Sequence, residues 1–528
     1  MTELSKKLFV RIAGVLLAVM LFAAGTPFCT YTAYAAEVPS RKQVEASGLP
    51  VLDITLDGYG EDDIHRSAWQ PAYCRLDMNG EVLETGAQIK GRGNYTWAQE
   101  KRPYAIKLDV KQKWFGFSGA RDWVLLADYT DETHLRNYFA FTLASGFRFS
   151  FTPKVQHAHV YINGEYKGLY LIAEKVEIDD KRVDIDVTRG DLLLELDNNY
   201  GYSEPEQIST PMGNLLVVKD PDSEEYRMKA EEAGSKLSFA AAKRFVKKCI
   251  SAFENGLLEN APLDELGNYI DLTFLVDWYI FNEIMKNDDS VFNSSIYLYS
   301  RFDDKLYMGP VWDYDISLAG IDRYTNLNPT GLQYLDNPWE RQGNWFLYLL
   351  NRDDFVNMVK ARWTELYGST LFSDSLKKLS DTASAIRKDV SYDYALYDNR
   401  GVFVNMADYS KACNYLMNYI TERITWLNSE WGDGSSGELH YETPKPEETQ
   451  EPEPTPGEPE ITEAPKNQTP GPEVTAEPFP QNEDAPTWPA LIIASVVSFA
   501  LGAGAAVLVM IILKKQRTKK ENSPEDKA

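Results

Sequence analysis

Cysteine and histidine are scarce in this chain, which has four cysteines and five histidines among its 528 residues. One cysteine falls within the first 35 residues, which leaves Cys74, Cys249 and Cys413 for the rest. Such an odd, sparse set excludes a disulfide-stabilised scaffold, and no cysteine or histidine spacing is typical of a zinc site. Basic residues are also fewer than acidic ones, and the net charge of −25 argues against nucleic-acid binding.

The first 35 residues follow the order of a secretory signal peptide. Lys6, Lys7 and Arg11 precede an apolar run at 12–24, and Ala33-Tyr34-Ala35 has the small-x-small pattern of a cleavage site. We therefore predict that residues 1–35 are a signal peptide and leave them out of the fold.

Three segments near the other end are also predicted to lie outside the folded domain. Residues 441–487 are rich in proline, glutamate and threonine, so we expect a disordered linker. Residues 490–513 form an uncharged apolar run that is long enough for one transmembrane helix, and a basic tail follows at 514–528. The positive-inside rule predicts a cytoplasmic tail, so the chain between signal peptide and membrane would lie outside the cytosol.

The remaining part, 37–440, is predicted to have an α+β fold with two lobes. Strand-like runs dominate residues 50–195, where Asn79-Gly80 and Asn163-Gly164 are strong signals of β-hairpins. Helical periodicity dominates residues 196–440. We therefore expect an antiparallel, β-rich first lobe and a helical second lobe.

Two short acidic clusters lie in the second lobe. Asp288 and Asp289 follow an apolar helical run, and Asp313-Tyr314-Asp315 follows a strand-like run. Aspartate is disfavoured in strands and costly to bury unless it is paired or binds a metal, so the clusters indicate one shared cation site. Our working hypothesis is Mg²⁺-dependent phosphotransfer. Loop aspartates that cap turns explain this stretch, taken alone, equally well.

A glycine-rich loop and a strand lysine in the first lobe are candidates for phosphate binding. The backbone of Gly91-Arg92-Gly93-Asn94 could approach a phosphate closely, and Arg92 adds a bidentate donor. Lys107 ends the apolar run Tyr104-Ala105-Ile106, where a charged side chain needs a partner. Each feature alone has an ordinary explanation, a glycine bulge or a lysine on a solvated strand face. Their combination is typical of ATP binding in kinases.

Six short motifs occur in a characteristic order: Gly91-Arg92-Gly93-Asn94, Lys101-Arg102-Pro103-Tyr104 with Lys107, Leu135-Arg136-Asn137, Gly168-Leu169-Tyr170 with Glu174, Asn287-x-Asp289, and Gly309-Pro310-Val311-Trp312-Asp313-Tyr314-Asp315. As a set they resemble the CotH family of spore-coat-type atypical protein kinases, over about residues 50–431. The resemblance implies a divergent protein-kinase-like fold with Mg-ATP between two lobes. It also implies phosphorylation of serine or threonine in protein substrates.

The resemblance makes Lys107 the lysine that holds the phosphates. Arg92, Gly93 and Asn94 would line the loop over the nucleotide, and Glu174 would lie where the chain passes between the lobes and contact adenine. The acidic partner of Lys107 stays open, because Glu132 lies too near the start of its helix.

The catalytic base is a choice between two neighbours. In a typical kinase the base precedes a metal-binding Asn by five residues, which fits Asp288 and Asn293. The Asn-x-Asp pattern of the family instead selects Asp289, and we expect Asp289 to accept the substrate hydroxyl proton, with Asp288 as the alternative. Asp313 would then bind Mg²⁺, with Asp315 on the same face of an extended segment as a second ligand.

These features predict a membrane-anchored kinase that uses ATP and Mg²⁺ outside the cytosol on surface or spore-coat-type proteins. Two alternatives stay open. Tyrosine and tryptophan are abundant, so the domain could be an inactive kinase-like module that binds carbohydrate at the cell surface. The same fold could also transfer a nucleotidyl group to protein. We predict no nucleic-acid partner and no particular oligomeric state.

Overall fold

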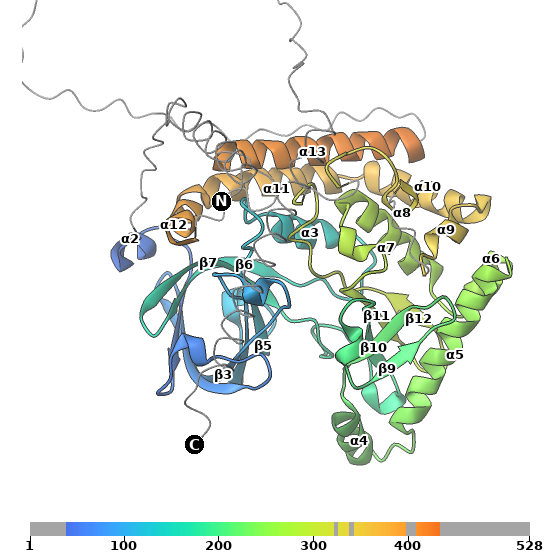
Figure 1. The fold of residues 1–528 in the computed structure, drawn as a ribbon, viewed down its shortest axis with the longest axis horizontal. Helices are drawn as coiled ribbons and strands as arrows, with labels where there is room; N and C mark the ends of the chain where they lie inside the picture. Colours follow the sequence, from blue (N-terminus) through green and yellow to red (C-terminus); the bar gives the residue numbers. More distant parts are fainter. Residues whose placement is uncertain (1–37, 322–325, 337–342, 398–407, 433–528) are drawn as a thin grey trace, which may run out of the picture. The chain divides into compact units, whose positions relative to one another are not determined.

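The computed structural model describes residues 38–321, 326–336, 343–397 and 408–432. They form a mixed α+β fold with two sheets, one of which closes into a barrel (Figure 1). The predicted signal peptide, linker, transmembrane helix and basic tail, at 1–35, 441–487, 490–513 and 514–528, lie outside the described residues. In the part of the chain that is described, no helix is both long and apolar enough to cross a membrane.

The barrel has the strand order β1-β2-β3-β4-β5-β7-β6 and is closed by the parallel pairing of β1 with β6. The predicted hairpins are confirmed, since Asn79-Gly80 joins β2 to β3 and Asn163-Gly164 joins β6 to β7, all four at positive φ. Alternate apolar side chains point inward to form the barrel core. The strands are β1 Val51–Leu56, β2 Gln70–Met78, β3 Glu81–Gly91, β4 Tyr104–Gln112, β5 Ala120–Leu126, β6 Val155–Ile162 and β7 Glu165–Glu174.

A second sheet, with the order β12-β11-β8-β10-β9, is antiparallel throughout. One face of β8 buries Leu192, Leu194 and Leu196 in the main hydrophobic core, which the helices complete. The strands are β8 Leu192–Leu196, β9 Gln207–Ser209, β10 Leu215–Asp220, β11 Ile296–Ser300 and β12 Leu306–Met308.

The central helix is α7, Leu272–Met285, whose residues from Leu275 onward are all buried. The Asp271 carboxylate caps its first turn by accepting from the Thr273 and Phe274 backbone N–H groups. Lys286 ends it in the left-handed conformation, with φ 45°. The other helices are α2 Arg41–Glu45, α3 Arg136–Ala144, α4 Ser223–Glu232, α5 Phe239–Leu258, α6 Leu263–Leu266, α8 Gln333–Asp336, α9 Phe346–Leu349, α10 Asp353–Tyr367, α11 Leu371–Ala385, α12 Arg387–Tyr397 and α13 Tyr409–Trp431.

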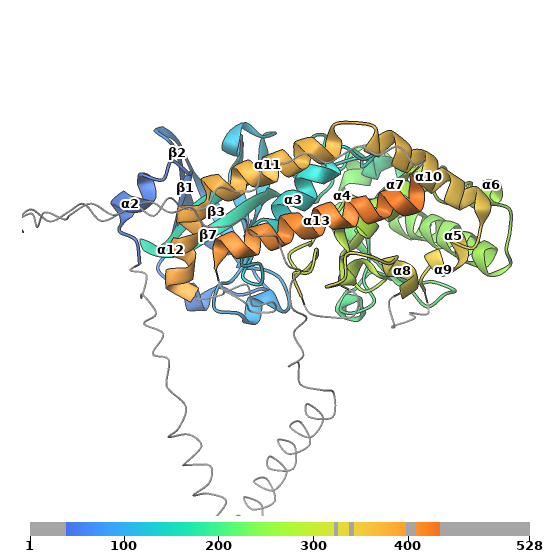
Figure 2. The ribbon, with the colours of Figure 1, turned by 90° about the horizontal axis from the view of Figure 1, so that it is seen from above.

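Buried polar contacts attach the barrel to the helices through α12. Asp389 lies 2.9 Å from His159 Nε2 on β6, and Asp393 lies 2.9 Å from Lys101 Nζ. Helices α11, α12 and α13 run along the same side of the fold (Figure 2). The barrel, the second sheet and the helices therefore belong to one compact unit.

The predicted fold was wrong in two respects. The first lobe is a closed barrel with one parallel strand pair, not an antiparallel sheet. The second part is not simply helical, because it contains a five-stranded sheet, and β8 crosses residue 195, where the first lobe was predicted to end. Barrel closure pairs strands about a hundred residues apart, such as Val51 with His159, and pairing over that distance leaves no local pattern in the sequence.

Candidate active site

The chain leaves α7 directly into the first predicted acidic cluster. Asp288 and Asp289 lie in a short 3₁₀ helix, η6 Asp288–Ser290, which Asn287 caps by accepting from the Asp289 N–H at 3.3 Å. Asn293 follows this helix, and its side-chain amide donates to Asp289 Oδ1 at 2.9 Å. The predicted base and the predicted amide ligand are therefore in direct contact.

The two neighbouring aspartates act on different groups. Burial, the largest cause, lowers the pKa of Lys286 to about 8, and Asp288 is among the carboxylates that oppose this shift. Asp289 instead raises the pKa of Asp313. Of the two candidates for the base, Asp289 is thus the one whose charge acts on the second acidic cluster.

Asp313 and Asp315 lie in the irregular segment after β12, and both are half-buried. Asp313 adopts φ 71°, in the left-handed region that is unfavourable for most non-glycine residues. Ser295 Oγ donates to Asp313 Oδ2 at 3.2 Å, and Thr130 Oγ1 donates to Asp315 Oδ2 at 2.9 Å. Hydroxyl groups from two distant parts of the chain therefore hold the two carboxylates.

Asp289, Asp313 and Asp315 form a group that we call the aspartate cluster. Burial is the largest cause of a raised pKa at Asp313, where Arg92 opposes the shift and Asp289 adds to it. Burial also raises the pKa of Asp315, and the charges of Asp313, Asp128 and Asp289 raise it further. The cluster thus has surplus negative charge in a partly desolvated place, which is the condition that favours a bound cation.

Arg92 reaches the aspartate cluster from the barrel. It lies in the loop after β3, and its Cζ is 5.2 Å from the ring centroid of Trp312, the residue before Asp313. Burial lowers the pKa of Arg92, while Asp313 and Asp315 raise it. The loop that was predicted to cover a nucleotide therefore lies against the predicted metal ligands.

Gly93 and Asn94, the next residues of the loop, have contacts of a different kind. Gly93 has φ 77°, and a Cβ there would lie 2.3 Å from Thr96 Oγ1, so the turn requires glycine. Asn94 is exposed, and its Oδ1 accepts from Arg66 Nη1 at 3.0 Å. Gly93 and Asn94 thus shape the loop, whereas Arg92 alone contacts the cluster side.

Lys107 belongs to a group of cations on the outside of the barrel. Its Nζ lies 5.5 Å from the ring centroid of Trp69, and Lys90 Nζ of β3 lies 4.7 Å from the same ring. Burial lowers the pKa of Lys90, and the charges of Lys175, Lys107 and Arg92 lower it further. We call Lys90, Lys107, Lys175 and Arg92 the cation patch. Lys175 is paired with Glu177 at 3.2 Å and lies 3.6 Å from Asp122, so part of the positive charge is compensated. The grouping of four cations still favours a bound anion such as a phosphate chain.

The acidic partner of Lys107 stays open. With the other described residues, Lys107 forms no salt bridge, and its register partner on β5 is Asp122. Asp122 Oδ1 lies 3.6 Å from Lys175 Nζ instead. The barrel therefore keeps this lysine available for a ligand on its outer face.

Glu174 is not brought to the aspartate cluster. Its register partner on β5 is Trp123, a residue of the barrel core, and its Oε2 accepts from the Lys154 N–H at 3.0 Å. Burial raises the pKa of Glu174. The contact with adenine that the family resemblance implies stays a prediction.

Three residues of the second sheet near the cluster were missed in the sequence. Glu195 of β8 and Tyr297 of β11 are register partners, and Lys219 Nζ lies 2.9 Å from Glu195 Oε2. Burial is the largest cause of a raised pKa at Glu195 and at Tyr297, and Asp313 contributes to both shifts. Glu195 sits in an apolar strand, the same signal that singled out Lys107, and could have been found by it.

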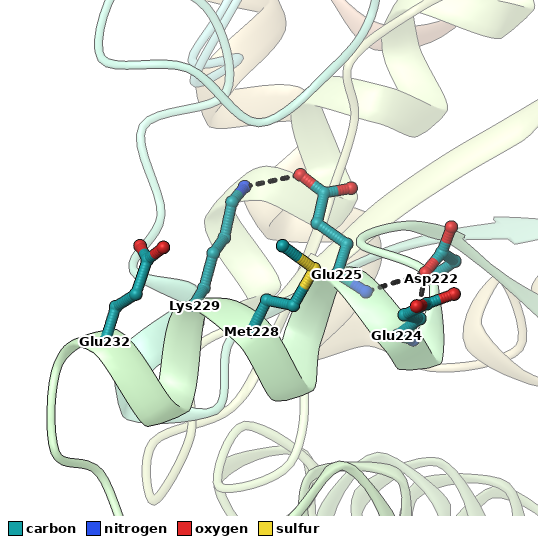
Figure 3. A pocket seen from close by; sticks show the side chains of 6 residues that line it. All are labelled: Asp222, Glu224, Glu225, Met228, Lys229 and Glu232. Atoms are coloured by element: carbon teal, nitrogen blue, oxygen red, sulfur yellow. Dashed lines mark hydrogen bonds and ion pairs between the residues drawn. The ribbon is translucent and has the colours of Figure 1, made fainter.

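Two surface hollows lie apart from this site. One, of about 410 Å³, runs along α4 and is lined mostly by acidic side chains around Met228 (Figure 3). Lys229 in its lining pairs with Glu225 at 2.8 Å. The other, of about 370 Å³, lies between α3, α10 and α11. None of the predicted site residues lines either hollow.

The aspartate cluster suits Mg²⁺ when a phosphate ligand is present. Among the described residues, no three His, Cys, Asp or Glu side chains are grouped closely enough to hold a metal ion by themselves. Mg²⁺ is usually held by one or two carboxylates together with substrate phosphates, so a preformed group of three is not needed. The raised pKa values of Asp313 and Asp315 show that the carboxylates lack full compensation from the protein.

Comparison with known families identifies the family of this chain. The family model described as CotH kinase protein matches residues 89–427, more than half of the chain. The chain belongs to the CotH family. The resemblance seen in the short motifs is thereby confirmed, and the CotH match runs from β3 to α13, so it contains every predicted site residue. No curated protein matched the chain.

Proposed function

We propose that this CotH-family protein is a kinase that uses ATP and Mg²⁺ to phosphorylate serine or threonine in protein substrates outside the cytosol. The observation that carries the proposal is the position of Arg92, which joins the aspartate cluster to the cation patch. Phosphoryl transfer needs carboxylates for the cation and the acceptor hydroxyl, and cations for the phosphates. The signal-peptide pattern of residues 1–35 supports a location outside the cytosol.

Each group has a definite role in the proposed reaction. Asp289 accepts the proton of the acceptor serine or threonine hydroxyl while the hydroxyl oxygen bonds to the γ-phosphorus of ATP. ADP leaves with the electrons of the broken P–O bond. Asn293 orients the Asp289 carboxylate through the 2.9 Å hydrogen bond. Arg92, Lys90 and Lys107 bind the phosphate oxygens.

Asp313 and Asp315 are the groups that would hold Mg²⁺, which supplies positive charge to the phosphate oxygens when bound. Asn293 donates to Asp289 through its side-chain nitrogen, so its side-chain oxygen would be the atom that serves as a further ligand.

The test uses the full-length protein with Mg²⁺ and ATP that is labelled at either the γ or the α position, alone and with exported proteins. We expect the γ label to be transferred to protein and to be recovered as phosphoserine or phosphothreonine after hydrolysis of the protein. Asp289→Asn and Asp313→Asn should abolish it, whereas Asp303→Asn, on an exposed turn, should not.

Two other outcomes would reject the proposal that the protein is a kinase. Transfer of α label would identify a nucleotidyl transferase. A folded protein that shows no calorimetric binding of Mg-ATP would be an inactive kinase-like module, and carbohydrate binding should then be measured.

A further inference from the structure

Two asparagine side chains hold the peptide group that joins Asp313 to Tyr314. Asn287 Nδ2 donates to the carbonyl oxygen of Asp313 at 2.9 Å. The Tyr314 N–H donates to Asn137 Oδ1 at 2.8 Å. The acceptor and the donor of one peptide group are thus both satisfied by side-chain amides, which come from the segment after α7 and from α3. We call Asn137 and Asn287 the amide clamp.

The clamped peptide group lies between two members of the aspartate cluster and is unfavourable by itself. A non-glycine residue at φ 71°, such as Asp313, costs about 1 kcal/mol or more. The Asp313 and Asp315 carboxylates also repel each other. A strained backbone that carries like charges keeps one conformation only where its surroundings hold it.

Both members of the clamp are themselves held in place. Asn137 is 3% exposed, and its Nδ2 donates to Asp128 Oδ1 at 2.8 Å. Asn287 is 2% exposed, and its Oδ1 accepts from the Asp289 N–H. Asn287 therefore holds the backbone of Asp289 and of Asp313 at once, which fixes the two carboxylates relative to each other.

The partners of the clamped residue add a second anchor. The Tyr314 hydroxyl donates to Asn282 Oδ1 on α7 at 2.9 Å, which holds the end of the Tyr314 side chain against the central helix. In the described part of the chain, the amide clamp provides both side-chain hydrogen bonds to this peptide group, so release of the clamp would remove them. The peptide group between Asp313 and Tyr314 could then rotate, which would move the two carboxylates on either side of it.

We propose that the amide clamp aims the carboxylates of the aspartate cluster and thereby sets the affinity of the site for a divalent cation in its nucleotide complex. The identity of that ligand rests on the proposed function, whereas the clamp geometry does not. Asn137 and Asn287 are positioning residues, since they act through the peptide group between the carboxylates.

Cation affinity, measured with Mn²⁺ by electron paramagnetic resonance, tests the clamp in the full-length protein with a non-hydrolysable ATP analogue. Asn137→Ala should raise the Mn²⁺ Kd about tenfold or more, the usual effect of removing an outer-shell partner. The matched control is Asn344→Ala. Asn344 is also 3% exposed, and its amide also makes two hydrogen bonds. It accepts from a backbone N–H, that of Phe346, as Asn137 does, and it donates to the Tyr334 carbonyl oxygen, where Asn137 donates to a carboxylate. We expect the control to lose similar thermal stability and to keep its Mn²⁺ Kd within about twofold.

A charge-conserving exchange keeps the test decisive if Asn137→Ala does not fold. In the double variant Asp128→Asn with Asn137→Asp, position 137 still accepts from Tyr314 and again has a hydrogen-bonding partner at position 128. Asp128 has φ 46°, which asparagine tolerates. The double variant should recover Mn²⁺ affinity that Asn137→Asp alone loses. Equal affinities of Asn137→Ala and Asn344→Ala, or an exchange no tighter than Asn137→Asp, would overturn the proposal.

The same measurements separate this inference from the kinase proposal. If the wild-type protein binds Mn²⁺ with the nucleotide analogue but transfers no phosphate, the kinase proposal fails and the affinities still decide the role of the clamp. If it binds no Mn²⁺ with the analogue, the clamp has no cation to position and the inference fails. If the wild-type protein both binds Mn²⁺ and transfers phosphate, Asn137→Ala should lower kcat at limiting Mg²⁺, and the kcat of the variant should recover as the Mg²⁺ concentration rises.

Discussion

Arg92 stacks on Trp312, with its guanidinium carbon 5.2 Å from the centre of the indole ring. This contact joins the glycine-rich loop of the barrel to the segment that carries Asp313. It places a permanent positive charge beside two carboxylates whose pKa values burial raises. The cation that the sequence pattern assigned to phosphate is therefore also the counter-charge of the aspartate cluster.

Replacement of Arg92 by methionine should raise KM for ATP and lower kcat, each by about tenfold, because a charge-assisted bidentate donor is lost. Arg102→Met is the matched control, since Arg102 also lies 5.2 Å above a tryptophan ring, that of Trp97. Steady-state kinetics of both variants should show the loss at Arg92 alone. Equal effects of the two changes would mean that arginine stacking, not contact with ATP, is responsible.

The choice between the two neighbouring aspartates can be settled kinetically. Asp289→Asn should lower kcat by about a thousandfold with little change in KM for ATP, as expected for loss of a general base. Asp288→Asn should keep kcat within about tenfold, because Asp288 acts on Lys286 and not on Asp313. A larger loss at Asp288 would reverse the assignment. Thermal unfolding of both variants checks that each is folded.

The lysines of the cation patch should differ in their importance for ATP. Lys90→Met should raise KM for ATP by about tenfold and more than Lys107→Met does, because burial and the charges of Lys175, Lys107 and Arg92 all lower the pKa of Lys90, and a bound phosphate would relieve that repulsion. Lys111→Met provides a control on the same strand as Lys107, since Lys111 is exposed and paired with Asp179 at 2.8 Å. KM values for ATP at two salt concentrations are the measurement. No change in any of the three variants would show that phosphates bind elsewhere.

Loss of a carboxylate from the aspartate cluster should stabilise the protein. Burial and three neighbouring carboxylates raise the pKa of Asp315, so its ionised form is unfavourable in the folded state at neutral pH. In EDTA, Asp315→Asn should raise the free energy of unfolding by about 1 kcal/mol while it weakens catalysis. Denaturant unfolding of wild type and variant gives the value. A destabilised variant would show that the hydrogen bond from Thr130 outweighs the repulsion.

His157 should make stability depend on pH. Burial, the largest cause, lowers the pKa of His157 to about 4, and the hydrogen bond to the His134 carbonyl oxygen opposes this shift. The charges of His134 and Lys101 lower the pKa further, while Asp131 raises it. A depressed histidine pKa means that the unfolded chain binds more protons, so stability is full above about pH 6.5 and falls as pH drops towards 4. Between pH 7 and pH 5 this histidine should cost about 2 kcal/mol.

The measurement compares unfolding free energies of wild type and His157→Gln across that pH range. The variant should lose about 2 kcal/mol less than wild type between pH 7 and pH 5. His65→Gln changes an exposed histidine and should follow the wild-type curve. Parallel curves for wild type and His157→Gln would contradict the prediction.

Local patterns predicted the hairpins and the family, but not the relations within the site. Asn79-Gly80 and Asn163-Gly164 were found because two-residue turns need positive φ, which those residues supply. Asn287-x-Asp289 was recognised as a motif, and the structure adds a physical reason for the asparagine, which also holds the Asp313 carbonyl. No local pattern showed which way Glu174 points. It pairs with Trp123 of β5, so its side chain lies on the face of the sheet that forms the barrel core.

The sequence by itself determined membership in the CotH family and the residues from which the site is built, because both depend on short segments whose residue types are read in order. Only the tertiary structure decided that β1 closes a barrel with β6, that a second sheet lies beside the helices, and that Arg92, Asn137 and Asn287 contact the segment 312–314. These relations join residues far apart along the chain. They follow from which strands pair and which buried polar groups need partners, and neither leaves a pattern in neighbouring residues.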